Sequence, residues 1–301
     1  MEDFSGESSF NYIKEILKFG PRPSGSKANL LVAKFISSSL KKNNWDIIIQ
    51  SFKLKTINKK IVQFRNILGI KKGKIDQDLM LGAHFDSRPY ADQEKNKSKH
   101  NTPILGANDD ASGVGVLLEI TRILKDFEPN YNIKILFTDA EDYEKDIEKG
   151  MYGAKYFVSR LTKEELKKIK SFIFLDMVGD YNLSLPYELN SDIRLFFLVR
   201  NQAERLGFED IMPSYTSTWI IDDHIPFKKK GIVVLNLIHL SNKHNLFVPY
   251  WHTTKDTLDK ISPVSLEKIG KILVETIKWF DKNGFSSLPG ETMTYFPDLI
   301  L

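Results

Sequence analysis

Cysteine is absent from the 301 residues of the chain. This absence excludes disulfide bonds, thiolate catalysis and zinc sites built from cysteine. The chain also lacks an apolar run long enough to span a bilayer, and its first residues lack the basic and apolar regions of a signal peptide. The localisation stays open, because proteins without disulfides occur on both sides of a membrane.

A strong charge of one sign is missing as well. The chain has 43 Lys and Arg residues against 39 Asp and Glu residues, which gives a formal net charge of +4. Its lysines lie in short scattered runs such as 228–230, and basic and aromatic residues do not combine into the groove pattern of nucleic-acid binders. We therefore expect no nucleic-acid partner.

The length and the 42% hydrophobic content allow one large domain to bury a full core, whereas two domains would be cramped. Short apolar segments alternate with helical patterns, which predicts an α/β fold. We expect a single domain over residues 1–301, a three-layer α/β/α sandwich with a mixed, mostly parallel central sheet, and a loosely held C-terminal arm at 283–301. Strands are expected at 45–54, 61–70, 78–84, 133–141, 172–176 and 232–238, and the longer helices at 10–17, 30–40, 111–124, 192–206 and 263–280.

Two adjacent carboxylates, Asp109 and Asp110, stand between a glycine-bearing turn and an apolar helix. A helix start favours anions, so a helix cap is the simpler interpretation, but a cap needs only one acid. Three apolar strands also end in polar side chains: the first at His84, the second at the acids Glu141 and Asp142, and the third at Asp176. In open α/β sheets this edge collects ligands and catalytic groups, and Asp, Glu and His are suitable zinc ligands.

Several separate segments carry a family resemblance. Residues 84–92, 102–109, 176–179, 222–227 and 251–253 resemble glutaminyl-peptide cyclotransferases, most of all the bacterial relatives of the animal-type glutaminyl cyclases. That family is related to the co-catalytic zinc aminopeptidases and shares their fold. The resemblance runs from about residue 10 to residue 280, and its motifs occur in the right order. Relatives of this kind are often exported to the periplasm or secreted.

The resemblance implies a metal site. Asp109, Asp142 and His252 would bind one catalytic zinc and leave a fourth position open. The family usually has Glu at the position of Asp142, and Asp is one methylene shorter but still a competent ligand. His84 is a possible ligand of a second metal: in the related aminopeptidases the matching histidine binds a second zinc, together with the acid that matches Asp176. The cyclases normally leave that second site empty, so one zinc per chain is expected.

The resemblance also implies roles in catalysis. Glu141 would be the general acid and base, and Asp176 and Asp222 would form a hydrogen-bonded carboxylate pair around it. Trp251 would line the substrate pocket. The substrate would be a peptide or protein with an N-terminal glutamine. Its α-amine attacks the γ-amide carbon, which zinc polarises, and ammonia leaves as the pyroglutamate ring closes.

Three positions leave substrate recognition open. Ile221 stands where the animal enzymes have Gln, Asn236 where they have His, and Tyr143 is the nearest aromatic residue to the position of a missing tryptophan. These departures leave the metal ligands intact. Asp110 is expected to be structural, and in relatives the peptide bond before it is often cis.

Two other functions remain possible. In a two-zinc aminopeptidase, Glu141 would activate a metal-bound water, and His84 and Asp176 would join the ligands. The third possibility is a catalytically inactive binding domain on the same fold, although the full set of acids and imidazoles disfavours it. The natural substrate, the number of metals and the oligomeric state are not determined by the sequence.

Overall fold

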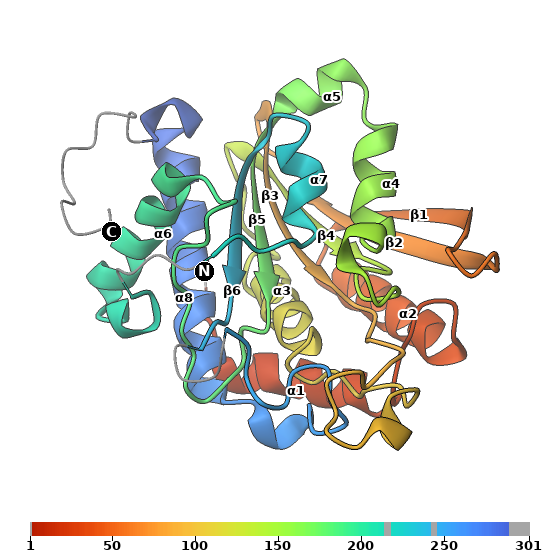
Figure 1. The fold of residues 1–301 in the computed structure, drawn as a ribbon. Coiled ribbons are helices and arrows are strands. Elements are labelled where there is room, and N and C mark those ends of the chain that lie inside the picture. Colours follow the sequence, from red (N-terminus) through yellow and green to blue (C-terminus); the bar gives the residue numbers. More distant parts are fainter. Residues whose placement is uncertain (1, 214–217, 242–245, 289–301) are drawn as a thin grey trace.

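The computed structural model describes residues 2–213, 218–241 and 246–288 (Figure 1). Its strands are β1 (Asp46–Lys55), β2 (Ile61–Lys71), β3 (Ile75–His84), β4 (Tyr131–Thr138), β5 (Ile169–Asp176) and β6 (Val233–Ile238). Its α-helices are α1 (Gly6–Leu17), α2 (Lys27–Lys42), α3 (Ala111–Ile123), α4 (Tyr152–Arg160), α5 (Lys163–Lys168), α6 (Ile193–Leu206), α7 (His224–Lys228) and α8 (Pro263–Asn283).

The six strands form one sheet in the order β1-β2-β4-β3-β5-β6. The pairs β1/β2 and β2/β4 are antiparallel, and the pairs β3/β4, β3/β5 and β5/β6 are parallel. The expectation of a mixed, mostly parallel sheet is therefore confirmed. The chain crosses from one side of β3 to the other between β4 and β5, and such a switch point is where open α/β sheets bind ligands.

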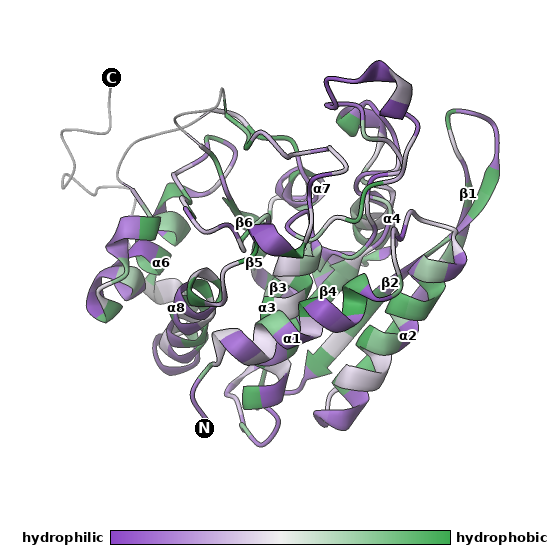
Figure 2. Cartoon of the chain, turned by 90° about the horizontal axis from the view of Figure 1, so that it is seen from below, coloured by the Kyte–Doolittle hydropathy of each residue, from purple (hydrophilic) through white to green (hydrophobic). Residues whose placement is uncertain are grey.

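Helices cover both faces of the sheet, so the expected three layers are present (Figure 1). One face packs against α1, α2, α3, α6 and α8, and the other against α4, α5 and α7. Figure 2 shows α2 as an alternation of hydrophobic and hydrophilic residues, as expected for a helix with one side on the sheet. Among the described residues, no helix is long and apolar enough to be a candidate membrane span.

Helix α3 is buried almost all round, and its small residues allow this. A Cβ atom at Gly113 would lie 2.5 Å from Asp110 Oδ2 and 3.0 Å from Ala83 Cβ. Glycine at this position thus lets the start of α3 approach the end of β3. As a result, the turn that carries Asp109 and Asp110 lies directly against the carboxyl edge of the sheet.

Two boundaries differ from those expected. Strand β4 ends at Thr138, so Glu141 and Asp142 lie in the loop after the strand and not on the strand itself. At the C-terminal end, Phe285 stacks edge-on against Tyr131 with ring centroids 5.2 Å apart and packs against the main core. The rest of the expected arm, residues 289–301, lies outside the described residues, and the arm stays a prediction.

Candidate metal and catalytic site

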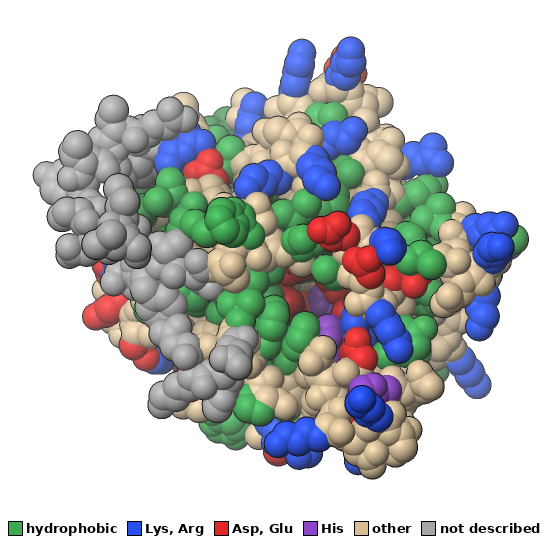
Figure 3. Space-filling model, in the orientation of Figure 1, with side chains coloured by type: hydrophobic (Ala, Val, Ile, Leu, Met, Phe, Trp, Pro, Cys, Tyr) green, Lys and Arg blue, Asp and Glu red, His purple; other side chains and the backbone are tan. Residues whose placement is uncertain are grey.

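The carboxyl ends of three neighbouring strands supply the predicted site residues. His84 and Asp176 are the last residues of β3 and β5, and Glu141 and Asp142 follow β4. Asp109 precedes α3 in the adjacent turn. In Figure 3, histidine and acidic side chains lie at the bottom of a hollow near the centre of the view, with hydrophobic side chains along one border.

The hollow is a cavity of about 330 Å³, which we call the acidic cavity. Its volume falls in the range of small-molecule sites, which is about 300–1,000 Å³. Its polar lining includes Asp92, Asp109, Glu141, Asp142, Asp176, Asp222, His252, Arg88 and Lys145, and its apolar lining includes Trp219, Ile220, Ile221, Leu246, Phe247 and Trp251. One acidic wall thus faces one aromatic and aliphatic wall.

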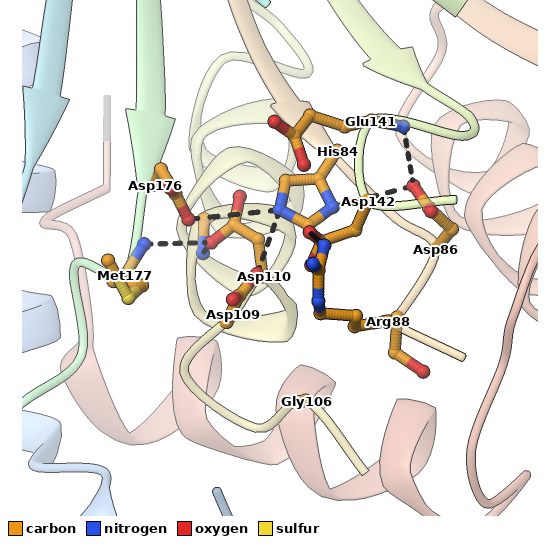
Figure 4. A network of polar contacts seen from close by, with 12 residues as sticks. His84, Asp86, Arg88, Gly106, Asp109, Asp110, Glu141, Asp142, Asp176 and Met177 are labelled. Atoms are coloured by element: carbon orange, nitrogen blue, oxygen red, sulfur yellow. Dashed lines mark hydrogen bonds and ion pairs between the residues drawn. The ribbon is translucent and has the colours of Figure 1, made fainter. Parts of the chain in front are cut away.

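The three predicted zinc ligands lie together. His252 Nε2 is 3.3 Å from Asp109 Oδ2 and 3.4 Å from Asp142 Oδ1. His84 Nε2 is 3.0 Å from Asp109 Oδ1, so Asp109 has an imidazole at each of its oxygens. Ligand atoms of His84, Asp109 and Asp142 also lie within 4.8 Å of one another (Figure 4).

Four buried atoms of this cluster have no hydrogen-bond partner among the described residues: Asp142 Oδ2, Asp176 Oδ1, His84 Nδ1 and His252 Nδ1. A buried polar atom without a partner costs about 1–3 kcal/mol, and native proteins rarely leave several together. A bound cation would satisfy the unpartnered carboxylate oxygens. Imidazole nitrogens and carboxylate oxygens are the donors that zinc takes in catalytic sites, so these residues fit a zinc ion.

Acidic side chains are concentrated in the cavity, and their mutual repulsion and burial shift their pKa values. Burial, the charge of Asp142 and, more weakly, that of Asp222 hold the pKa of Glu141 well above its ordinary value. Burial and the charge of Asp176 do the same to the pKa of Asp222. Burial lowers the pKa of His252, but the neighbouring Asp142 and Asp109 outweigh it and raise that pKa to about 9. The site therefore favours the binding of positive charge.

A second group of ligand atoms adjoins the first, and it contains His84, Asp110 and Asp176. His84 Nε2 is 3.8 Å from Asp176 Oδ1. Asp110 Oδ1, in contrast, accepts hydrogen bonds from the Gly113 N–H, the Ser112 hydroxyl and the Met177 N–H. Asp110 is thus the N-cap of α3, as expected for a structural residue, and the peptide bond before it is cis.

Asp222 has a different partner from the one expected. Among the described residues, no hydrogen bond joins it to Asp176; its Oδ2 accepts one from Asn236 Nδ2 at 2.9 Å, and its Oδ1 accepts one from the Asp223 N–H. Asp176 is turned toward His84 instead. Both carboxyl groups nevertheless line the acidic cavity, as does Ile221, one of the three positions at which substrate recognition was left open.

Trp251 lines the cavity as part of its aromatic wall, and its role in substrate binding stays a prediction. Its ring stacks on Phe247 with centroids 4.1 Å apart and on the imidazole of His252 at 3.7 Å. His252 has a left-handed backbone with φ of 52°, and Ala140 and Met177, at the ends of the other site loops, share this rare conformation. Such strained positions gather at functional sites.

Arg88 is a site residue that the sequence reasoning missed. Its Nη1 donates to Asp142 Oδ1 at 2.7 Å, and its Nε and Nη2 donate to the two oxygens of Asp92 at 2.8 Å. Arg88 therefore holds one oxygen of Asp142 and leaves the other, Oδ2, without a partner. The four-residue spacing of Arg88 and Asp92 inside the 84–92 motif was the available signal.

Two further residues hold the site loops from behind, and the sequence reasoning missed them as well. Arg22 is fully buried and donates to the carbonyls of Phe85, Leu105 and Gly106 at 2.7, 2.6 and 2.9 Å. Asp256 accepts the N–H groups of Asn108 and Asp109 at 2.8 and 3.1 Å. The turn before α3 is therefore fixed by two buried charges. Each has only backbone partners in that turn, so no side-chain pattern in the sequence marked them.

Comparisons with known proteins agree with this geometry. A model of the peptidase family M28 matches residues 66–277. The chain is 27% identical to an aminopeptidase of Bacillus subtilis (YwaD) over 89% of its length, which spans 55% of that protein. It is 25% identical to a glutaminyl-peptide cyclotransferase-like protein of Bos taurus over 84% of its length and 70% of that protein.

Solved structures show the same two kinds of relative. A glutaminyl cyclase of Bacteroides thetaiotaomicron, solved bound to N-acetylhistamine, superposes with a TM-score of 0.87 at 29% identity, over 92% of this chain and 98% of that one. A zinc-dependent exopeptidase of Parabacteroides distasonis superposes with a TM-score of 0.87 at 30% identity, with the same coverage. The shared fold thus includes both cyclases and exopeptidases.

Proposed function

The chain belongs to peptidase family M28, and from this premise we propose that it is a zinc-dependent glutaminyl-peptide cyclotransferase. It would convert the N-terminal glutamine of peptides or proteins to pyroglutamate and release ammonia. One zinc per chain would be held by Asp109, Asp142 and His252. When bound, the metal would polarise the γ-amide carbonyl of the substrate.

The position of Asp222 is the observation that carries the proposal. It lies in the acidic cavity on the 222–227 segment that resembles the cyclases, and its charge contributes to the raised pKa of Glu141. An acid at this place beside the general base can hold the proton close to the reacting groups while it moves from the amine to the leaving nitrogen.

The reaction needs only proton transfers from the protein. The neutral α-amine attacks the γ-amide carbon, and the new C–N bond closes the five-membered ring. Glu141 takes the proton from that amine and gives it to the departing amide nitrogen, which leaves as ammonia. A carboxyl group can do both, because its carboxylate form accepts a proton and its acid form donates one, and the raised pKa of Glu141 favours retention of the proton between the two transfers.

The apolar wall would hold the substrate in the folded shape that the ring requires. Trp251 stacks with Phe247 and with His252 and lines the cavity, so its ring is held in a fixed position beside the glutamine side chain. Positioning of this kind can supply much of the acceleration of an intramolecular reaction.

One observation favours a second candidate, a two-zinc aminopeptidase. His84 and Asp176 lie beside Asp109 on the side opposite His252, where a second metal would sit. The similarity to the Bacillus subtilis aminopeptidase points the same way. If this chain were such an aminopeptidase, Glu141 would activate water, and the product would be a free N-terminal amino acid.

A mass-spectrometric assay separates the candidates. The zinc-supplied protein is mixed with one peptide that begins with Gln and one that begins with Leu, each with and without a chelator. We expect loss of one ammonia from the Gln peptide alone, and we expect the chelator to abolish it. Release of leucine would replace the proposal by the aminopeptidase, and no reaction of either peptide would favour a binding domain.

A further inference from the structure

A second cavity of about 520 Å³ lies beside the acidic cavity, and the proposed reaction does not use it. We call it the lysine cavity, because Lys155, Lys229 and Lys230 line it. Its apolar lining includes Met151, Val158 and Pro226. In Figure 3, basic side chains gather above the central hollow, in the region that α4 and α7 occupy in Figure 1.

The two cavities share two walls. Ile221 lines both of them. On the other side, the loop after Asp142 contributes Ile147 to the acidic cavity and the next residue, Glu148, to the lysine cavity. A chain that leaves the acidic cavity between these walls therefore enters the lysine cavity next. Ile221 is also one of the positions where this sequence departs from the animal cyclases.

The two cavities carry opposite charge. Six carboxyl groups line the acidic cavity, whereas Glu148 is the single acid that lines the lysine cavity. Lys155 Nζ is engaged, because it donates to the carbonyls of Glu148 and Gly150 at 2.5 and 2.7 Å. Lys229 and Lys230 are exposed and form no ion pair with any residue that the structure describes. Their ammonium groups are thus available to a ligand.

The substrate must enter amine first. Its N-terminal residue occupies the acidic cavity, and the following residues leave toward solvent at about 3.3–3.6 Å per residue in an extended chain. Because the two cavities adjoin at Ile221, the residues that directly follow the first are the ones placed to reach the lysine cavity. There the apolar lining suits the methylenes of a side chain, and the two free lysines suit a carboxylate at its end.

We propose that the lysine cavity is a subsite for a carboxylate on one of the two residues that follow the substrate's first residue. The inference rests on the proposed cyclase function and adds a substrate class to it, namely peptides with an acidic residue at the second or third position, after an N-terminal glutamine. A short peptide can offer the same carboxylate from its own C-terminus. The charge pattern of the site thus runs from acidic at the amine to basic one or two residues later.

The test compares kcat/KM for three C-terminally amidated peptides, Gln-Glu-Glu-Ala, Gln-Ala-Ala-Ala and Gln-Lys-Lys-Ala, at low salt. We expect the acidic peptide to exceed the neutral one by about five- to tenfold, since each exposed charge pair contributes at most about 1 kcal/mol. The double variant Lys229→Glu and Lys230→Glu reverses the order of the acidic and basic peptides. Equal kcat/KM for the three peptides, or no effect of the double variant, overturns the proposal.

A matched control variant separates this effect from overall charge. Lys41 and Lys42 are also adjacent, exposed lysines at the end of a helix, and they line neither cavity. Changing both to Glu alters the net charge by the same amount and leaves the preference unchanged. Gln-Ala-Ala as free acid and as amide shows whether the lysines also take a terminal carboxylate, in which case the free acid is preferred by the wild type alone.

A binding measurement keeps this proposal distinct from the proposed function. Pyroglutamyl peptides with the same three tails are consumed by neither a cyclase nor an aminopeptidase, so calorimetry with the zinc-supplied protein reports binding alone. Tighter binding of the acidic tail, lost in the double lysine variant, supports the subsite even if no Gln peptide is cyclised. Cyclisation with no preference among the tails in either experiment rejects the subsite and leaves the cyclase intact.

Discussion

Asp109 and Asp110 are neighbours in the sequence, and their side chains have opposite surroundings. Asp109 faces His84 and His252, and although its burial opposes charge, the two imidazoles hold its pKa below the ordinary value. Asp110 faces N–H and hydroxyl groups at the start of α3, and burial and the charge of Asp176 hold its pKa well above the ordinary value. Identical residues one position apart are thus suited to a metal and to a helix cap.

The comparison extends to the regions around the two residues. On the side of Asp109, which we call the metal side, Asp142 Oδ2 and His252 Nδ1 are buried without partners. On the side of Asp110, the helix-start side, the protein itself supplies three donors to Oδ1, although Oδ2 has no partner among the described residues. The partners of the two aspartates, imidazoles for Asp109 and the donors at the start of α3 for Asp110, therefore distinguish the metal side from the helix-start side.

The sharpest test of this comparison is to change each aspartate to alanine. Asp109→Ala removes a ligand of the metal side, and we expect zinc to be lost and cyclase activity to fall by about 10⁴-fold. Asp110→Ala removes the cap of α3, and we expect the free energy of unfolding to fall by about 2 kcal/mol while zinc is retained. Zinc content per chain, product mass and thermal unfolding measure the three effects. If both variants lose zinc equally, the distinction between the two sides is wrong.

The next largest loss of activity is expected from changing Glu141, the proposed general acid and base. Glu141→Gln keeps the shape of the side chain but cannot carry the proton, so we expect kcat to fall by about 10³-fold. Glu141 is not a proposed ligand, and zinc content should match that of the wild type. A variant that loses activity together with its zinc would place Glu141 on the metal side instead.

A smaller loss of activity is expected from changing His84, and this change also tests the number of metals per chain. If only the metal side binds zinc, His84→Ala keeps about one zinc per chain and loses activity by about 10- to 100-fold through poorer orientation of Asp109. Asp86→Asn is a matched change beside the other nitrogen of His84, 3.4 Å from Nδ1, and should lose less. Two zincs in the wild type and one in His84→Ala would show that a second metal binds next to His84, outside the metal side.

The smallest effect concerns Asn236, where the cyclases of animals have His. Asn236→Ala removes the side-chain donor to Asp222, and we expect about a tenfold loss in kcat, the equivalent of one buried hydrogen bond of about 1.4 kcal/mol. Asn236→His should recover most of the loss if its ring supplies the same hydrogen bond. Loss of activity in both variants to the same extent would mean that packing in β6, and not the hydrogen bond, is what matters.

Much of the fold followed from the sequence because its signals are local. Apolar strands that end in His84 and Asp176, and a helix that starts after Asp110, are visible in windows of ten residues. The position of Glu141 was less visible, because β4 leaves the sheet at Thr138 and the acids follow in a loop. The periodicity of side chains does not show where a ladder of backbone hydrogen bonds ends.

The partners of the site residues were harder to predict for a different reason. Arg88 and Asp142 are 54 residues apart, and Asn236 meets Asp222 across the end of the sheet. The family resemblance assigned roles to single positions and paired Asp222 with Asp176. It could not show that Asp176 would turn toward His84, because that depends on which imidazole lies within reach once the strands are aligned.

Arg22 has a consequence for how the protein is made. It binds three carbonyls that are 63, 83 and 84 residues further along the chain, and it lies outside the segment 66–277 that matches the family. During synthesis it emerges long before its partners, so its contacts are among the non-local ones that form slowly. A truncated protein that starts at residue 66 would carry every proposed ligand, but the turn before α3 would open. Competence to bind metal should therefore arise only after the N-terminal helices have docked, late in folding.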